Sequence, residues 1–351
     1  MFERWMTKFS QDIAVDLGTS HTRVAVKDRG IVIHEPSLVT INTRTQAIVA
    51  VGTSARDMLG KTPAYLQVTR PLLKGVISDF EVTEKMLRYF IDRVHADIPT
   101  PLPRPRMVMT VPLETTEVER KAVEDAALSA GARSVTLVES PLAAAVGAAL
   151  PVLESIGSMV VDIGGGVTQI AVVSLGGVVT SRTLSVAGEE MTRNIVQYVR
   201  DAYSLLIGEK VAEEVKWRLG TTLDMGTGYE MEVRGRHLVT GLPKQIILKE
   251  GEVREALQKN VALIINSIKA TLEATPAELV ADIYERGIVL VGGTALLRGI
   301  EKSITREAAI PVRIVDDPMT AHVRGAAFLL GDNSFLSSVS LPSTQDASFT
   351  P

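Results

Sequence analysis

The chain has 351 residues, with 37 Lys and Arg against 41 Asp and Glu, a formal net charge of −4 and no Cys. This charge gives no global positive field for nucleic acid, and the lack of Cys excludes disulfides, thiolate catalysis and zinc–thiolate sites. The length is typical of two domains with separate cores. Apolar residues make up 46% of the chain but aromatic residues only 4%, which favours buried aliphatic sheets covered by helices.

Short runs rich in Val and Ile alternate with helical stretches, which predicts an α/β fold. In chain order, we expect strands at 13–16, 23–27, 31–33, 107–111, 135–138, 159–162, 169–174 and 288–291. We expect helices at 82–94, 116–130, 141–149, 191–203, 208–219, 254–270 and 295–307. Thr115 or Thr116 should cap the second of these helices, and only Thr116 would form a capping box, with Glu119.

No segment is expected to cross a membrane. The longest apolar stretch, 141–153, is shorter than the roughly 20 residues that a bilayer helix needs. Charges at Glu3, Arg4 and Lys8 interrupt the apolar N-terminus, so it lacks the features of a secretory signal. We therefore expect a cytoplasmic protein.

One pattern occurs twice. The sequence IAVDLGTSHTRVAV at 13–26 aligns with MVVDIGGGVTQIAV at 159–172, with its Asp, Gly and Thr in register. Each copy predicts a strand, an Asp-x-Gly turn and a second strand. Two such hairpins half a chain apart predict duplicated domains that face each other.

The two turns have the composition of phosphate-binding loops, because glycine allows backbone N–H groups to converge on an anion. The residues that would contact phosphate are Gly18, Thr19, Ser20, Thr22, Gly164, Gly165, Gly166 and Thr168. Asp16 and Asp162 would lie beside the phosphates, where Mg²⁺ bridging phosphate oxygens would relieve their repulsion. The alternative interpretation is that Asp and Gly only form hairpin turns.

A third glycine turn, Gly292, Gly293 and Thr294, leads from a strand into a helix and suits the close approach of a nucleoside or phosphate. Glu139 ends a predicted strand, where open α/β sheets place their ligands. It would orient a water for attack on a γ-phosphate, or else only favour the helix N-terminus that follows.

Glu213 and Lys216 lie one helical turn apart. They would face a ribose and base, or form an ordinary exposed pair.

Together these features resemble the MreB family of bacterial actins, within the actin, heat-shock chaperone and sugar kinase ATPase superfamily. The matching segments are VDLGTSHT, GIVIHEPSLVTI, RPLLKGVISDF, VPLETTEVERKAVEDAALSAGA, VESPLAAAVGAALPV, VVDIGGGVTQIAVVSLGGVV, LLIGEKVAEEVKWRLG, GIVLVGGTALLRGI and DDPMTAHVRGAA. The resemblance implies an actin-like two-domain ATPase fold, with duplicated mixed sheets flanked by helices and an interdomain nucleotide cleft for ATP and Mg²⁺.

The resemblance also implies domain boundaries. Domain I would be 1–147 with a small subdomain at about 31–75, completed by 321–335. Domain II would be 148–320 with a small subdomain at about 188–250, and 336–351 would be a flexible tail.

Carried over onto matching positions, the resemblance assigns roles to the site residues. Glu139, Asp162 and Thr168 would be catalytic, and Asp16 and Asp162 would hold the metal. The nucleotide would contact Gly18, Thr19, Ser20, His21, Gly164, Gly165, Gly166, Glu213, Lys216, Gly292, Gly293 and Thr294. Three positions depart from the family pattern: His21 replaces Asn, Ser140 replaces Glu, and Gln169 replaces an acid.

The function implied by the resemblance is ATP hydrolysis coupled to self-assembly into paired filaments at the inner face of the cell membrane. Such filaments would organise cell-wall synthesis and cell shape with membrane proteins of the elongation machinery. The alternatives are a divergent actin-like paralogue with weak ATPase activity or, further away, a chaperone-type or sugar-kinase-type ATPase.

The N-terminal residues Phe2, Trp5, Met6 and Phe9 follow helical spacing and predict a short amphipathic helix in a membrane interface. The alternative is a helix packed on the protein's own core. A loop around Ile98 and Leu102 is a second candidate anchor.

Overall fold

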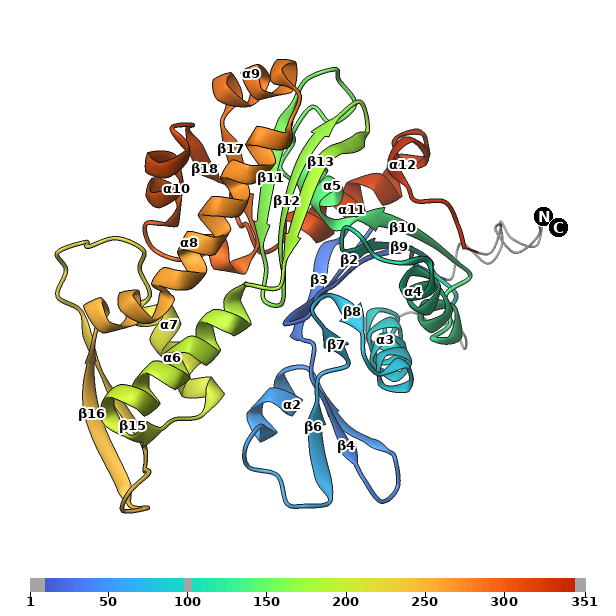
Figure 1. Cartoon of the computed structure of the whole chain (residues 1–351). Helices are drawn as coiled ribbons and strands as arrows, with labels where there is room; N and C mark the ends of the chain where they lie inside the picture. The colour runs from blue at the N-terminus through green and yellow to red at the C-terminus, as the bar shows by residue number, and fades with distance from the viewer. Residues whose placement is uncertain (1–9, 98–102, 345–351) are drawn as a thin grey trace. The chain divides into compact units, whose positions relative to one another are not determined.

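The computed structural model describes residues 10–97 and 103–344 (Figure 1). The chain divides into two compact units, which we describe separately. Unit 1 comprises Met1–Ser158, Val173–Val179 and Met319–Pro351, and unit 2 comprises Met159–Val172 and Thr180–Pro318. Unit 1 extends past the expected boundary at 147 and includes a turn from the second half of the chain. The reason is that the backbone N–H groups of Leu175 and Gly176 donate to the carbonyls of Glu154 and Val152.

Unit 1 is built on a five-stranded mixed sheet with strand order β10-β9-β1-β2-β3. Its strands are β1 (Ile13–Leu17), β2 (His21–Val26), β3 (Gly30–Pro36), β9 (Arg106–Val111) and β10 (Ser134–Glu139). β1 is antiparallel to β2 but parallel to β9, and β9 is parallel to β10. Every residue of the central strand β1 is buried, as its aliphatic sequence predicts.

Helices α3 (Phe80–Val94) and α4 (Glu117–Ser129) bury apolar side chains in the same cluster as this sheet. Thr116 caps α4 and forms a capping box with Glu119, which confirms the second of the two predicted registers.

A close helix crossing joins α5 (Ser140–Gly147) to α11 (Ala321–Gly331) within unit 1. A Cβ atom on Gly147 would lie 1.9 Å from the carbonyl oxygen of Ala321, and one on Gly325 would lie 1.8 Å from that of Ala143. Only glycine permits this approach. The crossing therefore joins a late segment of the chain to the first domain.

Unit 2 repeats the topology of unit 1, with strand order β13-β12-β11-β17-β18. Its strands are β11 (Ser158–Ile163), β12 (Thr168–Ser174), β13 (Gly177–Leu184), β17 (Ile288–Val291) and β18 (Val312–Ile314). As in unit 1, the first strand of the hairpin has a parallel neighbour: β11 is parallel to β17, and β17 is parallel to β18. The duplication predicted from the repeated sequence is confirmed in the strand order.

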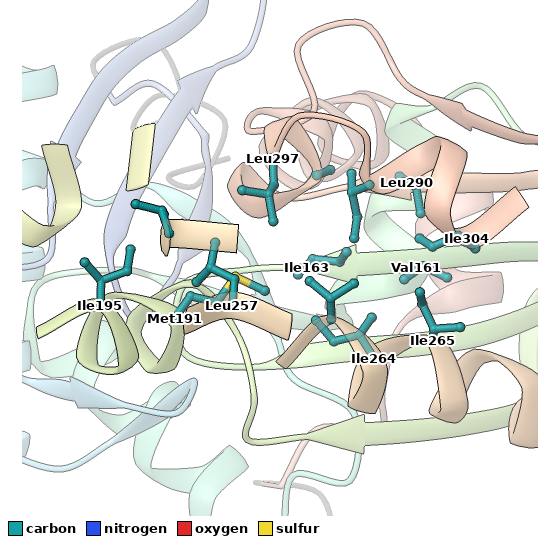
Figure 2. Packing of buried hydrophobic residues seen from close by; sticks show 14 of the residues in the cluster. Val161, Ile163, Met191, Ile195, Leu257, Ile264, Ile265, Leu290, Leu297 and Ile304 are labelled. Atoms are coloured by element: carbon teal, nitrogen blue, oxygen red, sulfur yellow. The ribbon is translucent and has the colours of Figure 1, made fainter. Parts of the chain in front are cut away.

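Helices enclose the core of this second sheet (Figure 2). They are α6 (Gly188–Tyr203), α7 (Glu209–Leu219), α8 (Glu250–Ala274), α9 (Ala277–Arg286) and α10 (Ile300–Ala308). Val161 and Ile163 of β11 and Leu290 of β17 share one cluster with Met191 of α6 and Ile264 of α8. This packing places α6 and α7 next to the turn between β11 and β12.

Each unit also carries a small antiparallel sheet. In unit 1 it consists of β4 (Val39–Asn42), β5 (Ile48–Val51) and β6 (Leu66–Thr69), with helix α2 (Thr53–Met58) and the ribbon β7 (Leu72–Leu73) and β8 (Val76–Ile77) nearby in the chain. In unit 2 it consists of β14 (Leu205–Leu206), β15 (Glu230–His237) and β16 (Pro243–Lys249).

Two predictions differ from the structure. The expected flexible tail begins instead within a helix, α12 (Asn333–Val339), and continues to contact unit 1. The N–H of Leu341 donates to the carbonyl of Leu137, and Thr344 lies 2.5 Å from the buried carboxylate of Glu124. These partners come from distant elements, so the local composition did not reveal them.

The predicted helix at 295–307 is divided into a short 3-10 helix, η1 (Gly293–Leu296), and α10. Gly299 separates them because it adopts a left-handed conformation with φ of 79°.

No helix within residues 10–97 and 103–344 has both the length and the apolar composition that crossing a bilayer requires.

Candidate functional site

The first predicted phosphate turn lies between β1 and β2. Its backbone is tight: a Cβ atom on Gly18 would lie 2.7 Å from the carbonyl oxygen of His21. Neighbouring segments hold the turn, because Ser37 Oγ donates to the carbonyl of Gly18 at 2.6 Å and Thr19 Oγ1 accepts the N–H of Gly75 at 2.7 Å. Ser37 and Gly75 lie in the matching segments GIVIHEPSLVTI and RPLLKGVISDF, but neither was among the predicted site residues.

The other predicted residues of this turn are also placed. The carbonyl of Ser20 accepts the N–H of Ser37 at 3.0 Å, and the hydroxyl of the fully buried Thr22 lies 2.9 Å from that of Ser37. The ring of His21 packs edge-on against that of His34, with their centroids 5.3 Å apart.

Asp16, at the end of β1, has a cationic partner in its own hairpin. Arg23 Nη1 lies 3.1 Å from Asp16 Oδ2, and Thr110 Oγ1 donates to Asp16 Oδ1 at 3.1 Å. Both members of the ion pair are nearly buried, with side-chain exposures of 10% and 11%. The negative charge of Asp16 is therefore balanced without a metal, which the sequence analysis did not foresee.

Asp162 occupies the equivalent position in the second hairpin, where a side-chain amide stands at the position of Arg23. Gln169, which aligns with Arg23, donates from Nε2 to Asp162 Oδ2 at 3.4 Å. The third glycine turn packs directly on this carboxylate, since a Cβ atom on Gly292 would lie 2.5 Å from Asp162 Oδ1. With its φ of 86°, Gly292 is required both by the turn and by this contact.

The second predicted phosphate turn, the third glycine turn and the start of α6 are joined by hydrogen bonds. The carbonyl of Gly164 accepts the hydroxyl of Thr294 at 2.9 Å and the N–H of Gly188 at 3.1 Å. The carbonyl of Gly165 accepts the N–H of Glu189 at 2.8 Å. The structure thus brings together two turns separated by about 130 residues.

The remaining predicted residues of these turns surround that contact. Gly166 is buried in the turn after β11, and Gly293 begins η1. The hydroxyl of Thr168, which is fully buried, donates to the carbonyl of Val186 at 2.7 Å.

Lys216 and Glu213 of α7 join the same cluster. Lys216 Nζ donates to the carbonyl of Gly188 at 2.7 Å, to Thr192 Oγ1 at 2.9 Å and to Glu213 Oε2 at 2.8 Å. Only 11% of the Lys216 side chain is exposed, against 44% for Glu213. The Lys216 ammonium is therefore nearly buried, whereas the Glu213 carboxylate is partly exposed.

Glu139 lies at the end of β10 and at the N-cap of α5, without a side-chain hydrogen bond to the helix. Burial raises the pKa of Glu139 above its ordinary value, and the positive charge of Arg120 only partly opposes this shift. A carboxyl of this kind remains a good proton acceptor once ionised.

The predicted membrane residues Phe2, Trp5, Met6 and Phe9 lie outside the described residues, as do Ile98 and Leu102 of the alternative anchor.

Asp162 and the glycine turns fit the coordination that magnesium takes with nucleotides. Mg²⁺ usually retains water and binds one or two carboxylates together with phosphate oxygens. The described residues contain no group of three or more His, Asp and Glu side chains that would hold a metal by themselves. A buried carboxylate beside turns rich in backbone N–H groups suits this shared coordination.

Two five-stranded sheets of the same strand order, each with an Asp-x-Gly hairpin on its central strand, define an actin-like ATPase fold. A model of the MreB/Mbl protein family matches residues 10–337, and the chain belongs to this family.

Individual relatives agree with this assignment. The cell shape-determining protein MreB of Escherichia coli K12 is 45% identical over 93% of this chain and 94% of its own. The crystal structure of MreB5 of Spiroplasma citri bound to ADP has a TM-score of 0.88 and 32% identity, covering 95% of this chain and 99% of that one. A structure described as the MamK double helical filament has a TM-score of 0.78 and 25% identity, covering 92% of this chain and 99% of its own.

Proposed function

We propose that this protein binds and hydrolyses Mg²⁺-ATP and that nucleotide turnover controls its assembly into membrane-associated filaments that organise cell-wall synthesis and cell shape. The observation that carries the nucleotide part is the cluster in unit 2. There, the carbonyl of Gly164 binds both Thr294 and the start of α6, while Lys216 and Glu213 meet the same end of α6. A phosphate turn and a nucleoside-binding pair are thereby held together. The MreB5 relative was crystallised with ADP and with AMPPNP.

In this proposal, different residues bind the phosphates, the nucleoside, the metal and the attacking water. The N–H groups of the turns at 18–20 and 164–166 bind phosphate, and Glu213 and Lys216 bind the nucleoside with the turn at 292–294. Asp162 holds the metal, with Asp16 in a supporting role, and Mg²⁺ neutralises phosphate charge when it is bound. The carboxylate of Glu139 orients the attacking water and accepts its proton.

Nucleotide binding and hydrolysis are tested together. The purified chain should gain thermal stability with Mg²⁺-ATP, and single-turnover assays should release phosphate. If ATP neither raises the melting temperature nor is hydrolysed, the nucleotide part of the proposal is wrong. A screen for phosphorylated small-molecule acceptors tests the sugar-kinase alternative.

Filament formation is supported by family membership and by the MamK relative, whose structure is described as a double helical filament. The test is sedimentation with ATP followed by electron microscopy on anionic lipid. Paired filaments that require ATP are the expected result. A chain that binds ATP but stays in the supernatant at all concentrations would contradict assembly.

Membrane association is supported by the position at which the two candidate anchors join the fold. The N–H of Gln11 donates to His95 Nε2 at 3.0 Å, and the hydroxyl of Ser10 accepts the N–H of Arg104 at 3.0 Å. Ser10 follows the apolar segment 1–9, while His95 and Arg104 flank the loop with Ile98 and Leu102. The described residues that flank the two candidate anchors in the chain therefore contact one another in unit 1.

Deleting residues 1–9 tests this anchor. One partly buried amphipathic segment binds a bilayer weakly, whereas a filament that carries many copies binds through avidity. The parental polymer should therefore float with anionic liposomes more than the monomer does. The truncated chain should lose flotation and retain ATP binding. Flotation of the truncated chain would place the anchor elsewhere, and its unfolding would favour packing of the segment on the core.

The second candidate function is a divergent filament protein that hydrolyses ATP poorly. The observation that favours it is Gln169, a neutral amide beside Asp162 at a position where the family usually has an acid. A chain that assembles with ATP but releases phosphate far more slowly than it assembles would support this alternative.

A further inference from the structure

The carboxylate of Glu213 is held by side chains from two helices. Thr192 Oγ1 of α6 lies 2.5 Å from Glu213 Oε2, and Lys216 Nζ lies 2.8 Å from the same oxygen. On the other oxygen, the indole N–H of Trp217 donates to Glu213 Oε1 at 3.1 Å. Three of the roughly four acceptor positions of the carboxylate are thus filled by the protein, and its orientation is fixed.

Lys216 alone would not fix this orientation. An ammonium group on a flexible side chain attracts a carboxylate but does not select one rotamer. Thr192 is only 1% exposed, and its hydroxyl proton has two acceptors within reach, Glu213 Oε2 at 2.5 Å and the carbonyl of Gly188 at 3.0 Å. The shorter contact favours donation to Glu213, while the hydroxyl oxygen accepts from Lys216 Nζ at 2.9 Å, so this buried hydroxyl contacts both charged groups. Trp217 is 54% exposed and holds the opposite side of the carboxylate.

We propose that Thr192 and Trp217 are positioning residues that orient the Glu213 carboxylate toward a hydroxyl or amino group of the nucleoside. An ionised carboxylate only accepts hydrogen bonds, so its ligand must be a donor. The inference rests on the proposed function, since it assumes that Glu213 contacts a nucleoside. Neither Thr192 nor Trp217 belongs to the site residues predicted from the sequence.

The expected consequence is selective for the nucleoside end of the ligand. Without the Thr192 hydroxyl, the carboxylate can rotate with the Lys216 ammonium, and a fixed acceptor is lost. We expect ATP affinity to fall about tenfold, the range for one well-oriented charge-assisted hydrogen bond. Binding of tripolyphosphate, which has no nucleoside, should not change.

The test compares T192V, which keeps the side-chain shape, with T192S, which restores the hydroxyl. T271V is the matched control, because Thr271 is also 1% exposed in a helix of unit 2, and its hydroxyl donates only to a backbone carbonyl four residues earlier, that of Ser267, at 2.8 Å. Dissociation constants for Mg²⁺-ATP and Mg²⁺-tripolyphosphate are measured by calorimetry for each full-length variant, with the melting temperature of the free protein. T192V should lose ATP affinity alone, T192S should recover it, and T271V should affect only stability.

Trp217 is tested by W217F and by fluorescence. The chain has two tryptophans, so W5F leaves Trp217 as the single reporter. ATP should change its emission because the carboxylate that accepts its N–H gains a further donor from the nucleoside, whereas tripolyphosphate should not. W217F removes the N–H but retains an aromatic ring, and we expect a loss of about threefold in ATP affinity.

The outcomes separate this inference from the proposed function. If the parental chain binds no ATP, or if E213Q binds it with parental affinity, the proposed function is wrong at this site. If E213Q weakens ATP binding but T192V and W217F do not, only the positioning role fails. Equal losses of ATP and tripolyphosphate affinity in T192V, or the same ATP loss in T271V, would also overturn it.

Discussion

The hairpins of the two units are the same element in sequence and topology, yet their carboxylates have different surroundings. Asp16 in unit 1 forms a nearly buried ion pair with Arg23, whereas Asp162 in unit 2 accepts a hydrogen bond from the neutral Gln169. We propose that this difference separates two roles. The carboxylate paired with Arg23 would contribute mainly to stability, and the carboxylate that accepts from the Gln169 amide would serve the cation.

The largest expected effect tests the second hairpin. D162N should weaken Mg²⁺-dependent ATP binding by at least about 100-fold, because it removes the negative charge that a divalent cation requires. The loss of stability should be small, since an amide can still accept the hydrogen bond from Gln169. Calorimetry with and without Mg²⁺ measures the effect. Parental Mg²⁺ dependence in D162N would show that this carboxylate does not serve the metal.

The next effect tests the first hairpin. D16N should lower the free energy of unfolding by about 3 kcal/mol, because it leaves the Arg23 guanidinium buried without its counter-charge. Combining it with R23Q should recover part of this loss. Urea unfolding of the two single variants and the double variant measures it. If D16N is as stable as the parental chain, the ion pair between Asp16 and Arg23 does not contribute to the stability of unit 1.

Substitution of Glu139 tests whether hydrolysis depends on a residue of unit 1, whereas metal binding depends on a residue of unit 2. E139Q should slow single-turnover hydrolysis by about 100-fold, as for loss of a general base, and should leave ATP affinity nearly unchanged. Because burial raises the pKa of Glu139, the carboxylate form is lost at a higher pH than for an ordinary Glu. Parental hydrolysis should therefore decrease as pH falls through this raised pKa, and E139Q should lack that decrease. An identical pH profile in both would assign the titration to another group.

A smaller change would make the second hairpin resemble the first. In Q169R, a guanidinium placed at the position equivalent to Arg23 would pair with Asp162 and compete with the metal. We expect ATP affinity to fall about tenfold, while higher Mg²⁺ concentrations restore part of it. The reverse substitution, R23Q, serves as the comparison and should act mainly on stability. An unchanged Mg²⁺ requirement in Q169R would show that the residue opposite Asp162 does not decide whether this carboxylate binds the metal.

The smallest expected effect is on stability at low pH, where unit 1 should lose the contribution of a second ion pair, between Glu35 and Arg93. Partial burial raises the pKa of Glu35, but hydrogen bonds from Thr53 and Arg93 and the charge of Arg93 outweigh it, so the net shift is downward. The stabilisation is therefore present above the unfolded pKa and is lost as pH falls through the lowered folded value. We expect a loss of about 1 kcal/mol or less in this window, with E35Q showing none. Urea unfolding against pH measures it.

Local sequence patterns were enough to predict most of the strands and helices and the locations of the glycine turns. The strand runs around Asp16 and Asp162, the capping box at Thr116 and the turn at Gly292 are local patterns, and each depends on residues close together in the chain. Duplication also followed from sequence alone, because two copies of one pattern must form the same hairpin. The two matching strand orders agree with this prediction.

The partners of these residues became apparent only in the folded chain. Arg23 pairs with Asp16 across a hairpin, Thr192 reaches Glu213 from another helix, and Leu341 of the expected flexible tail reaches Leu137. Such contacts join side chains or backbone groups of different strands and helices, so neither propensity nor periodicity encodes them. They form because a buried charge or backbone group must find a partner wherever the packing of the helices and sheets provides one.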